Sequence, residues 1–136
     1  MPLKVSLRAG ERVIVNGALI SADSPTSLVF HNRVTMILER QILRPENANT
    51  PSRRIYFAIQ NAYVADEAER PAWLEQARAF ISDLEGATTQ RSVKDRLAHV
   101  RAKLDAFEFY PAMREARELF AHDDAMLSPP SARSEG

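Results

Sequence analysis

The chain has 136 residues, and its 45% hydrophobic content is enough to build a sizeable core in one domain or two joined halves. It has no cysteine, which excludes disulfides and cysteine-ligated metal centres and favours a cytoplasmic protein. The formal net charge is zero, and no apolar run approaches the roughly eighteen residues of a membrane helix. We therefore expect neither a general polycation nor a membrane protein.

The charge is divided unevenly along the chain. Residues 1–60 carry eight basic and four acidic side chains, a net charge of +4, whereas residues 61–136 have a net charge of −4. Seven of the eight N-terminal cations are arginines, whose planar guanidinium group suits phosphate. This pattern is typical of an anion-binding face, but a solvated β-surface beside solvated helices would produce it equally well.

The first forty residues have the pattern of short antiparallel strands. Apolar residues alternate over residues 3–7, which predicts a half-buried strand with a basic outer row. The dipeptide Asn16-Gly17 predicts a tight hairpin, and residues 22–27 are expected to form a loop. About five short strands make up the predicted β-unit at residues 1–44, and they are expected at 3–7, 12–15, 18–21, 28–30 and 34–39.

The stretch that follows the β-unit contains a clear helix start. Thr50 can cap the first amides, and Pro51 suits the first helical position. Arg53 and Arg54 then fall in the first turn, where the helix dipole disfavours cations. This basic pair predicts an external anion or acidic partner, or else a salt bridge to an acid elsewhere in the fold, such as Glu46.

Residues 45–127 are predicted to contain about four helices. The second begins at Pro71 and ends near Gly86, and the last begins at Pro111. The third has inward-facing residues at a 4-3-4-3 spacing, which favours an antiparallel helix hairpin or a short coiled-coil seam. That seam consists of Val93, Leu97, Val100, Leu104 and Phe107. Residues 128–136 are expected to be disordered, so the predicted fold is α+β with a tail.

No catalytic motif is present. The sequence lacks a P-loop, a GxGxxG fingerprint, an HExxH motif and a cysteine nucleophile. The run His122-Asp123-Asp124 resembles a metal cluster, but it lies where the predicted order of the chain ends. We expect no enzyme activity, no metal and no cofactor.

A binding module fits the residues better than an enzyme does. A small β-unit with a basic row can hold nucleic-acid phosphates, and RNA recognition adds aromatic stacking. Tyr56 and Phe57 follow the basic pair closely and are the better candidates for stacking, although burial is the alternative for at least one of them. The candidate RNA-binding residues are Arg53, Arg54, Arg44, Arg8, Arg12, Lys4 and Tyr56.

Two segments, MPLKVSLRAGERVIVNGALI and ILRPENANTPSRRIYFAIQNAY, resemble the FlbT family of flagellin-synthesis regulators, and the resemblance extends over most of residues 1–120. It implies a cytoplasmic, alphaproteobacterial protein that regulates flagellin expression after transcription. Members of this family associate with the 5′ untranslated region of flagellin mRNA and promote its decay, although some relatives behave as activators. The resemblance also implies a functional partner of the FlaF type.

Two further interpretations stay open at this point. The helical half could be a protein-interaction adaptor that affects mRNA only through a partner, as its heptad-like segment and the zero net charge suggest. The short strands, which have no obvious edge protection, could also form a homo-oligomer through their edges.

Overall fold

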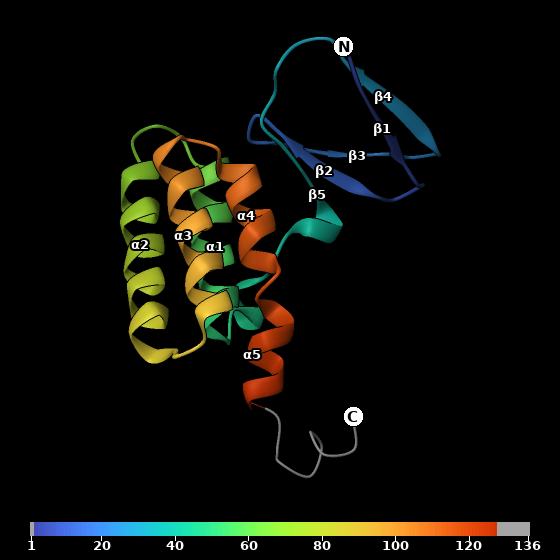
Figure 1. Cartoon of the computed structure of the whole chain (residues 1–136). Helices are drawn as coiled ribbons and strands as arrows, with labels where there is room; N and C mark the ends of the chain where they lie inside the picture. The colour runs from blue at the N-terminus through green and yellow to red at the C-terminus, as the bar shows by residue number, and fades with distance from the viewer. Residues whose placement is uncertain (1, 128–136) are drawn as a thin grey trace. The chain divides into compact units, whose positions relative to one another are not determined.

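The computed structural model describes residues 2–127, which form two compact units (Figure 1). The first unit ends at Ile42 and contains strands, and the second begins at Leu43 and contains α-helices. This confirms the predicted α+β class. The tail expected to be disordered, residues 128–136, lies outside the described residues.

The first unit consists of two small antiparallel sheets. One pairs β1 with β4, and the other has the order β3-β2-β5. The β2–β3 turn at Asn16-Gly17 has positive φ angles of 49° and 85°, which is the conformation that this dipeptide favours. The strands are β1 (Leu3–Leu7), β2 (Arg12–Val15), β3 (Ala18–Ser21), β4 (Thr26–Phe30) and β5 (Met36–Leu38), and the 3₁₀ turn η1 (Glu39–Gln41) follows.

The β-unit differs from the prediction at β4, which begins two residues earlier than expected. The sequence pattern predicts a loop at Thr26, but this residue pairs with Leu7 at the end of the β1–β4 ladder. The core of the unit is small, and in β1 it takes alternate residues, so the residues between them face outward. The buried members of this core are Val5, Leu7, Val13, Ala22 and Leu38.

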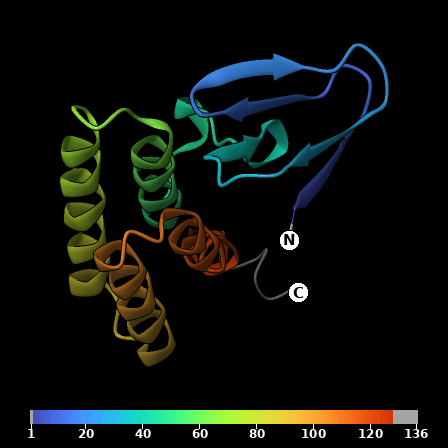
Figure 2. The same ribbon diagram turned by 90° about the horizontal axis from the view of Figure 1, so that it is seen from above.

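The second unit is a helical bundle. Helix α1 packs against α2 and α4, and α3 packs against α4 and α2. Figure 2 shows α1 (green) beside α2 (yellow-green). The largest buried side chains of this second unit include Ile55, Ile59, Ile81, Leu97 and Met113. The elements are η2 (Pro45–Asn47), α1 (Pro51–Val64), α2 (Arg70–Ala87), α3 (Arg91–Asp105), α4 (Phe109–Arg117) and α5 (Phe120–Leu127).

The described residues contain five α-helices instead of the four predicted, because the last predicted helix is divided into α4 and α5. At the division the backbone tightens from the α to the 3₁₀ pattern. The Glu118 amide donates to Glu115 and the Leu119 amide donates to Ala116, three residues back in each case. No gap in the apolar pattern marks this turn, since the apolar residues Ala116, Leu119 and Phe120 continue across it.

The prediction that Phe107 continues the buried seam of α3 is wrong. Val93, Leu97, Val100 and Leu104 are buried as expected, but Phe107 is 72% exposed. The helix ends at Asp105, and Phe107 takes a left-handed conformation with φ of 58°. Its amide donates to Leu104, and the next amide donates to Lys103, which is the Schellman pattern that usually has glycine at this position.

No helix within residues 2–127 combines the length and the apolar character needed to cross a membrane.

Candidate nucleic-acid interface

Two of the predicted cations of the β-unit lie on its surface without an ion pair. Lys4 is exposed on the outer row of β1, opposite Val29 of β4. Arg8 is exposed just after β1, and its backbone amide donates to Glu11 Oε1 at 3.0 Å. Neither side chain forms an ion pair with another residue in the described range 2–127. Both side chains are therefore accessible to an external anion, although the Arg8 charge also acts on Glu11.

The third predicted cation of this unit is neutralised within the fold. Arg12 pairs with Glu39, and the neighbouring Arg40 pairs with Glu11 at 2.9 Å. The Arg8 amide, followed by Arg40, holds the pKa of Glu11 below its ordinary value. Glu11 and Glu39 are thus salt-bridge partners, and Arg12 offers an incoming phosphate less than Lys4 and Arg8 do.

In the second unit, the N-terminus of α1 is built as the sequence predicts. The Thr50 side chain caps the helix by accepting from the Arg53 amide at 3.3 Å, and Pro51 stands in the first turn. These contacts join residues that are at most three positions apart. The local amino-acid sequence can therefore predict them.

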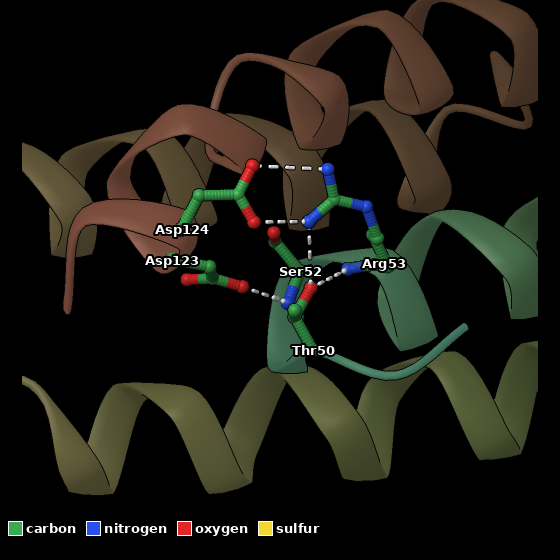
Figure 3. A network of polar contacts seen from close by, with 5 residues as sticks. All are labelled: Thr50, Ser52, Arg53, Asp123 and Asp124. Atoms are coloured by element: carbon green, nitrogen blue, oxygen red, sulfur yellow. Dashed lines mark hydrogen bonds and ion pairs between the residues drawn. The ribbon is translucent and has the colours of Figure 1, made fainter. Parts of the chain in front are cut away.

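The side chain of Arg53 forms an ion pair with a carboxylate that lies 71 residues further along the chain (Figure 3). Its Nη1 donates to Asp124 Oδ1 at 2.7 Å and its Nη2 to Asp124 Oδ2 at 3.1 Å, a bidentate pair between α1 and α5. The guanidinium carbon also lies 4.6 Å from the centre of the Phe120 ring. The salt-bridge interpretation of Arg53 is thereby confirmed, with Asp124 and not Glu46 as the acid.

A second carboxylate of α5 binds the end of α1 directly. Asp123 is buried, and its Oδ2 accepts from the Ser52 amide at 2.6 Å. This amide is one of the first-turn donors that have no partner within the helix, and the helix dipole favours a negative charge there. The α1 N-terminus and Arg53 therefore form an anion site, and two aspartates of the same chain occupy it.

The electrostatics agree with this geometry. The hydrogen bond from Arg53 holds the pKa of Asp124 below its ordinary value of 3.8. Reciprocally, the hydrogen bond to Asp124 raises the pKa of Arg53. Both charges are thus stabilised by the pair across the neutral range.

The other cations near α1 lie at the surface. Arg54 is exposed and borders a small cavity of about 200 Å³ together with Phe80 and Asp83. Arg44 is exposed at the start of η2. Within residues 2–127, neither of them has an ion pair. Arg44, Arg53 and Arg54 belong to the second unit, and Lys4, Arg8 and Arg12 belong to the first.

Tyr56 does not fit its predicted role of stacking on a base, because it is only 4% exposed. Its ring packs edge-on against Phe120 of α5, with 5.5 Å between the ring centres. Burial of the phenol raises its pKa. Phe57 is half-buried and packs against Trp73. Folding accounts for both rings, so the burial alternative holds for Tyr56.

Sequence reasoning missed the role of Ser52, Phe120, Asp123 and Asp124 in this site. In the sequence, Asp123 and Asp124 stand out only as part of the metal-like run that begins at His122. They lie 71 residues from the groups that they bind. The sequence contained one signal for this contact. Neither the basic dipeptide Arg53-Arg54 nor the acidic dipeptide Asp123-Asp124 had a local partner in the sequence, so each was a candidate partner for the other.

Comparison with known proteins gives consistent relatives. The chain matches the family model "Flagellar protein FlbT" over residues 3–127. A relative from Allorhizobium ampelinum, named "Probable flagellum biosynthesis repressor protein FlbT", is 32% identical over 126 residues, which cover 93% of this chain and 84% of the relative. The "Flagellum biosynthesis repressor protein FlbT" of Caulobacter vibrioides is 30% identical over 128 residues, which cover 93% and 90% of the two chains. No solved structure matches.

The fold and the site define a small α+β protein in which a β-unit with exposed cations precedes a helical unit with an internally filled anion site. The matches identify its family. The chain belongs to the FlbT family of flagellar proteins, as the resemblance of its sequence implied.

Proposed function

We propose that this protein represses flagellin expression after transcription, by associating with the 5′ untranslated region of flagellin mRNA and promoting its decay. Membership of the FlbT family and the repressor names of its relatives support a regulatory role in flagellum biosynthesis. The role in RNA binding rests on the exposed cations of the chain.

This proposal rests mainly on Lys4 and Arg8. Lys4 lies on the outward face of β1, and Arg8 follows directly after this strand. Both side chains are exposed, and neither forms an ion pair within the described part of the chain. Neither cation is needed for the core of the unit, since both lie on its outward face. Phosphates of a nucleic acid would neutralise them and release counterions, which favours binding.

Arg44 and Arg54 offer additional contacts in the helical unit. Both are exposed and lack an ion pair among the described residues. Arg12 and Arg53 already have acidic partners, so their contribution to RNA binding would require an exchange of partners.

Direct binding can be tested with purified protein and a flagellin leader RNA, with no other protein present. We expect a mobility shift or filter retention of the RNA that weakens as the salt concentration rises. An absence of binding at low salt would contradict the proposal.

A second function is favoured by one specific observation. Phe107 is 72% exposed and adopts a backbone conformation that ordinarily belongs to glycine. An exposed aromatic side chain at a strained position suits the docking of another protein. In this version the protein is an adaptor, and a FlaF-type regulator would be its partner. RNA binding that occurs only after the partner is added would favour the adaptor.

A further inference from the structure

The anion site at the α1 N-terminus has more hydrogen-bond donors than its two aspartates use. The Ser52 amide and two guanidinium nitrogens are satisfied by Asp123 and Asp124. The Ser52 hydroxyl is fully buried, yet its oxygen has no partner among residues 2–127. Figure 3 shows this hydroxyl pointing to the side of α1 where Arg53 meets Asp124. Buried side-chain polar groups without a partner are rare in folded proteins, so this hydroxyl is a donor that the two aspartates leave unused.

The chemistry of these donors suits a phosphate group. Ser52 supplies an amide and a hydroxyl, and Arg53 supplies a planar pair of N–H groups. The Thr50 oxygen accepts from Arg53 and holds it at the end of the helix. All of these groups lie at the positive end of the α1 dipole. A phosphate has more acceptor oxygens in one place than a carboxylate and can satisfy the Ser52 hydroxyl as well.

The segment that fills the site is weakly anchored by apolar contacts. Helix α5 has eight residues, and Asp123 is the one buried residue within its range 120–127. Phe120 is half-buried, while Met126 and Leu127 are exposed. A helix of this length is not stable alone, so its docking depends on contacts with α1, which include the two carboxylates and the Phe120 ring. The Asp124 side chain is 56% exposed, which leaves the ion pair open to competition from solvent.

We propose that the α1 N-terminus is a phosphate-binding site, formed by Thr50, Ser52 and Arg53, and that α5 masks it with Asp123 and Asp124. The incoming group is a phosphodiester of RNA, and this source rests on the proposed function. RNA binding at this site requires α5 to undock, so α5 acts as a built-in competitor. The leader RNA would then engage Arg53, beside the exposed Arg54, only after the aspartates have left.

The site can be tested with inorganic pyrophosphate as the probe, which separates this inference from RNA binding. The full-length, ¹⁵N-labelled protein is titrated, and the Ser52 and Arg53 amide resonances are followed. We expect pyrophosphate to bind the double variant Asp123→Asn, Asp124→Asn at least about tenfold more tightly than the wild type, because the resident competitor is lost. In the wild type, saturation should shift the resonances of residues 120–127 toward unfolded values.

Matched variants exclude a general effect of charge. Glu67→Gln with Glu75→Gln removes two exposed acids elsewhere in the helical unit, and its affinity for pyrophosphate should equal that of the wild type. Adding Arg53→Gln to the Asp123→Asn, Asp124→Asn background should abolish the gain, even if α5 no longer docks in that background. Equal affinity of the wild type and the double variant, or perturbations away from Ser52 and Arg53, would overturn the proposal.

The same variants distinguish this inference from the proposed function. Tighter pyrophosphate binding without any binding of leader RNA would support the phosphate site and contradict the RNA role. Binding of leader RNA that is identical in the wild type and the Asp123→Asn, Asp124→Asn variant would support the RNA role and contradict the masking by α5.

Discussion

At the scale of single residues, the contact between Arg53 and Asp124 holds α5 against the first turn of α1. The pair is bidentate, and the Arg53 side chain is 22% exposed. Thr50 accepts from both the amide and Nη1 of Arg53, at 3.3 Å and 3.4 Å. Arg53 therefore links the N-cap of α1 to the final helix. The protonation state of Asp124 determines the pH range in which this ion pair exists.

The Asp124 contact should make stability depend on pH in acid. Its folded-state pKa lies below the ordinary 3.8, so the stabilisation is complete above that value and is lost as the pH falls through the folded pKa. Urea unfolding should therefore show the wild type to be more stable than Asp124→Asn between pH 5 and 7, with the difference disappearing below pH 3.8. A difference that persists unchanged well below that pH would contradict the ion pair.

Phe107 gives a second prediction at this scale. A left-handed conformation costs a non-glycine residue about 1–2 kcal/mol, and glycine avoids this cost. Phe107→Gly should therefore unfold with a free energy about 1 kcal/mol higher than that of Phe107→Ala, which also loses the ring but keeps the strain. Chemical denaturation measures both variants. A glycine variant less stable than the alanine variant would show that the turn is not strained.

At the scale of elements, the strands and helices could be predicted because their signals are local. The Asn16-Gly17 turn and the Thr50-Pro51 helix start depend on neighbours in sequence. Partners of long side chains could not be predicted in this way. Arg101 was close enough to Asp105 for a pair within α3, but it instead bonds Glu85 of α2. The packing of α2 against α3 determines that Arg101 binds Glu85. The pattern of a single sequence does not reveal this packing.

The Arg101 contacts should stabilise the packing of α2 on α3. Its guanidinium donates to both Glu85 oxygens, at 3.1 and 2.8 Å, and to Ser82 at 2.8 Å. We expect Arg101→Ala to lower the free energy of unfolding by about 0.5–1 kcal/mol, since the pair is about a third exposed. Arg91→Ala is the control, because its 3.9 Å pair with Asp95 is exposed on both sides and should contribute little. Equal losses in thermal or urea unfolding would refute the distinction.

The edge strand β3 gives a prediction about self-association. It lies at one end of its sheet, its four residues are exposed, and none of them is charged, so a second copy could pair with it without repulsion. We expect the wild type to dimerise at micromolar concentration and Leu19→Lys to be monomeric in sedimentation. Leu127→Lys changes a leucine of similar exposure, 64% against 62%, and should still dimerise. A monomeric wild type would contradict this interface.

At the scale of the whole molecule, the protein divides its charges between two units. The β-unit presents Lys4 and Arg8 without an ion pair in the described chain, whereas the helical unit fills its anion site with its own aspartates. The sequence predicted the excess of cations before residue 60. It could not predict which of them would be neutralised, because Glu39 and Asp124 reach Arg12 and Arg53 only through the fold.

The central claim is that the cations of the β-unit hold RNA phosphates, and the salt dependence of leader-RNA binding tests it most directly. Lys4→Ala with Arg8→Ala should weaken binding and reduce the slope of log K against log salt by about 0.7 per lost phosphate contact. Arg91→Ala with Lys94→Ala removes the same charge from α3 and should leave the slope unchanged. An unchanged affinity and slope in the Lys4, Arg8 variant would contradict the claim.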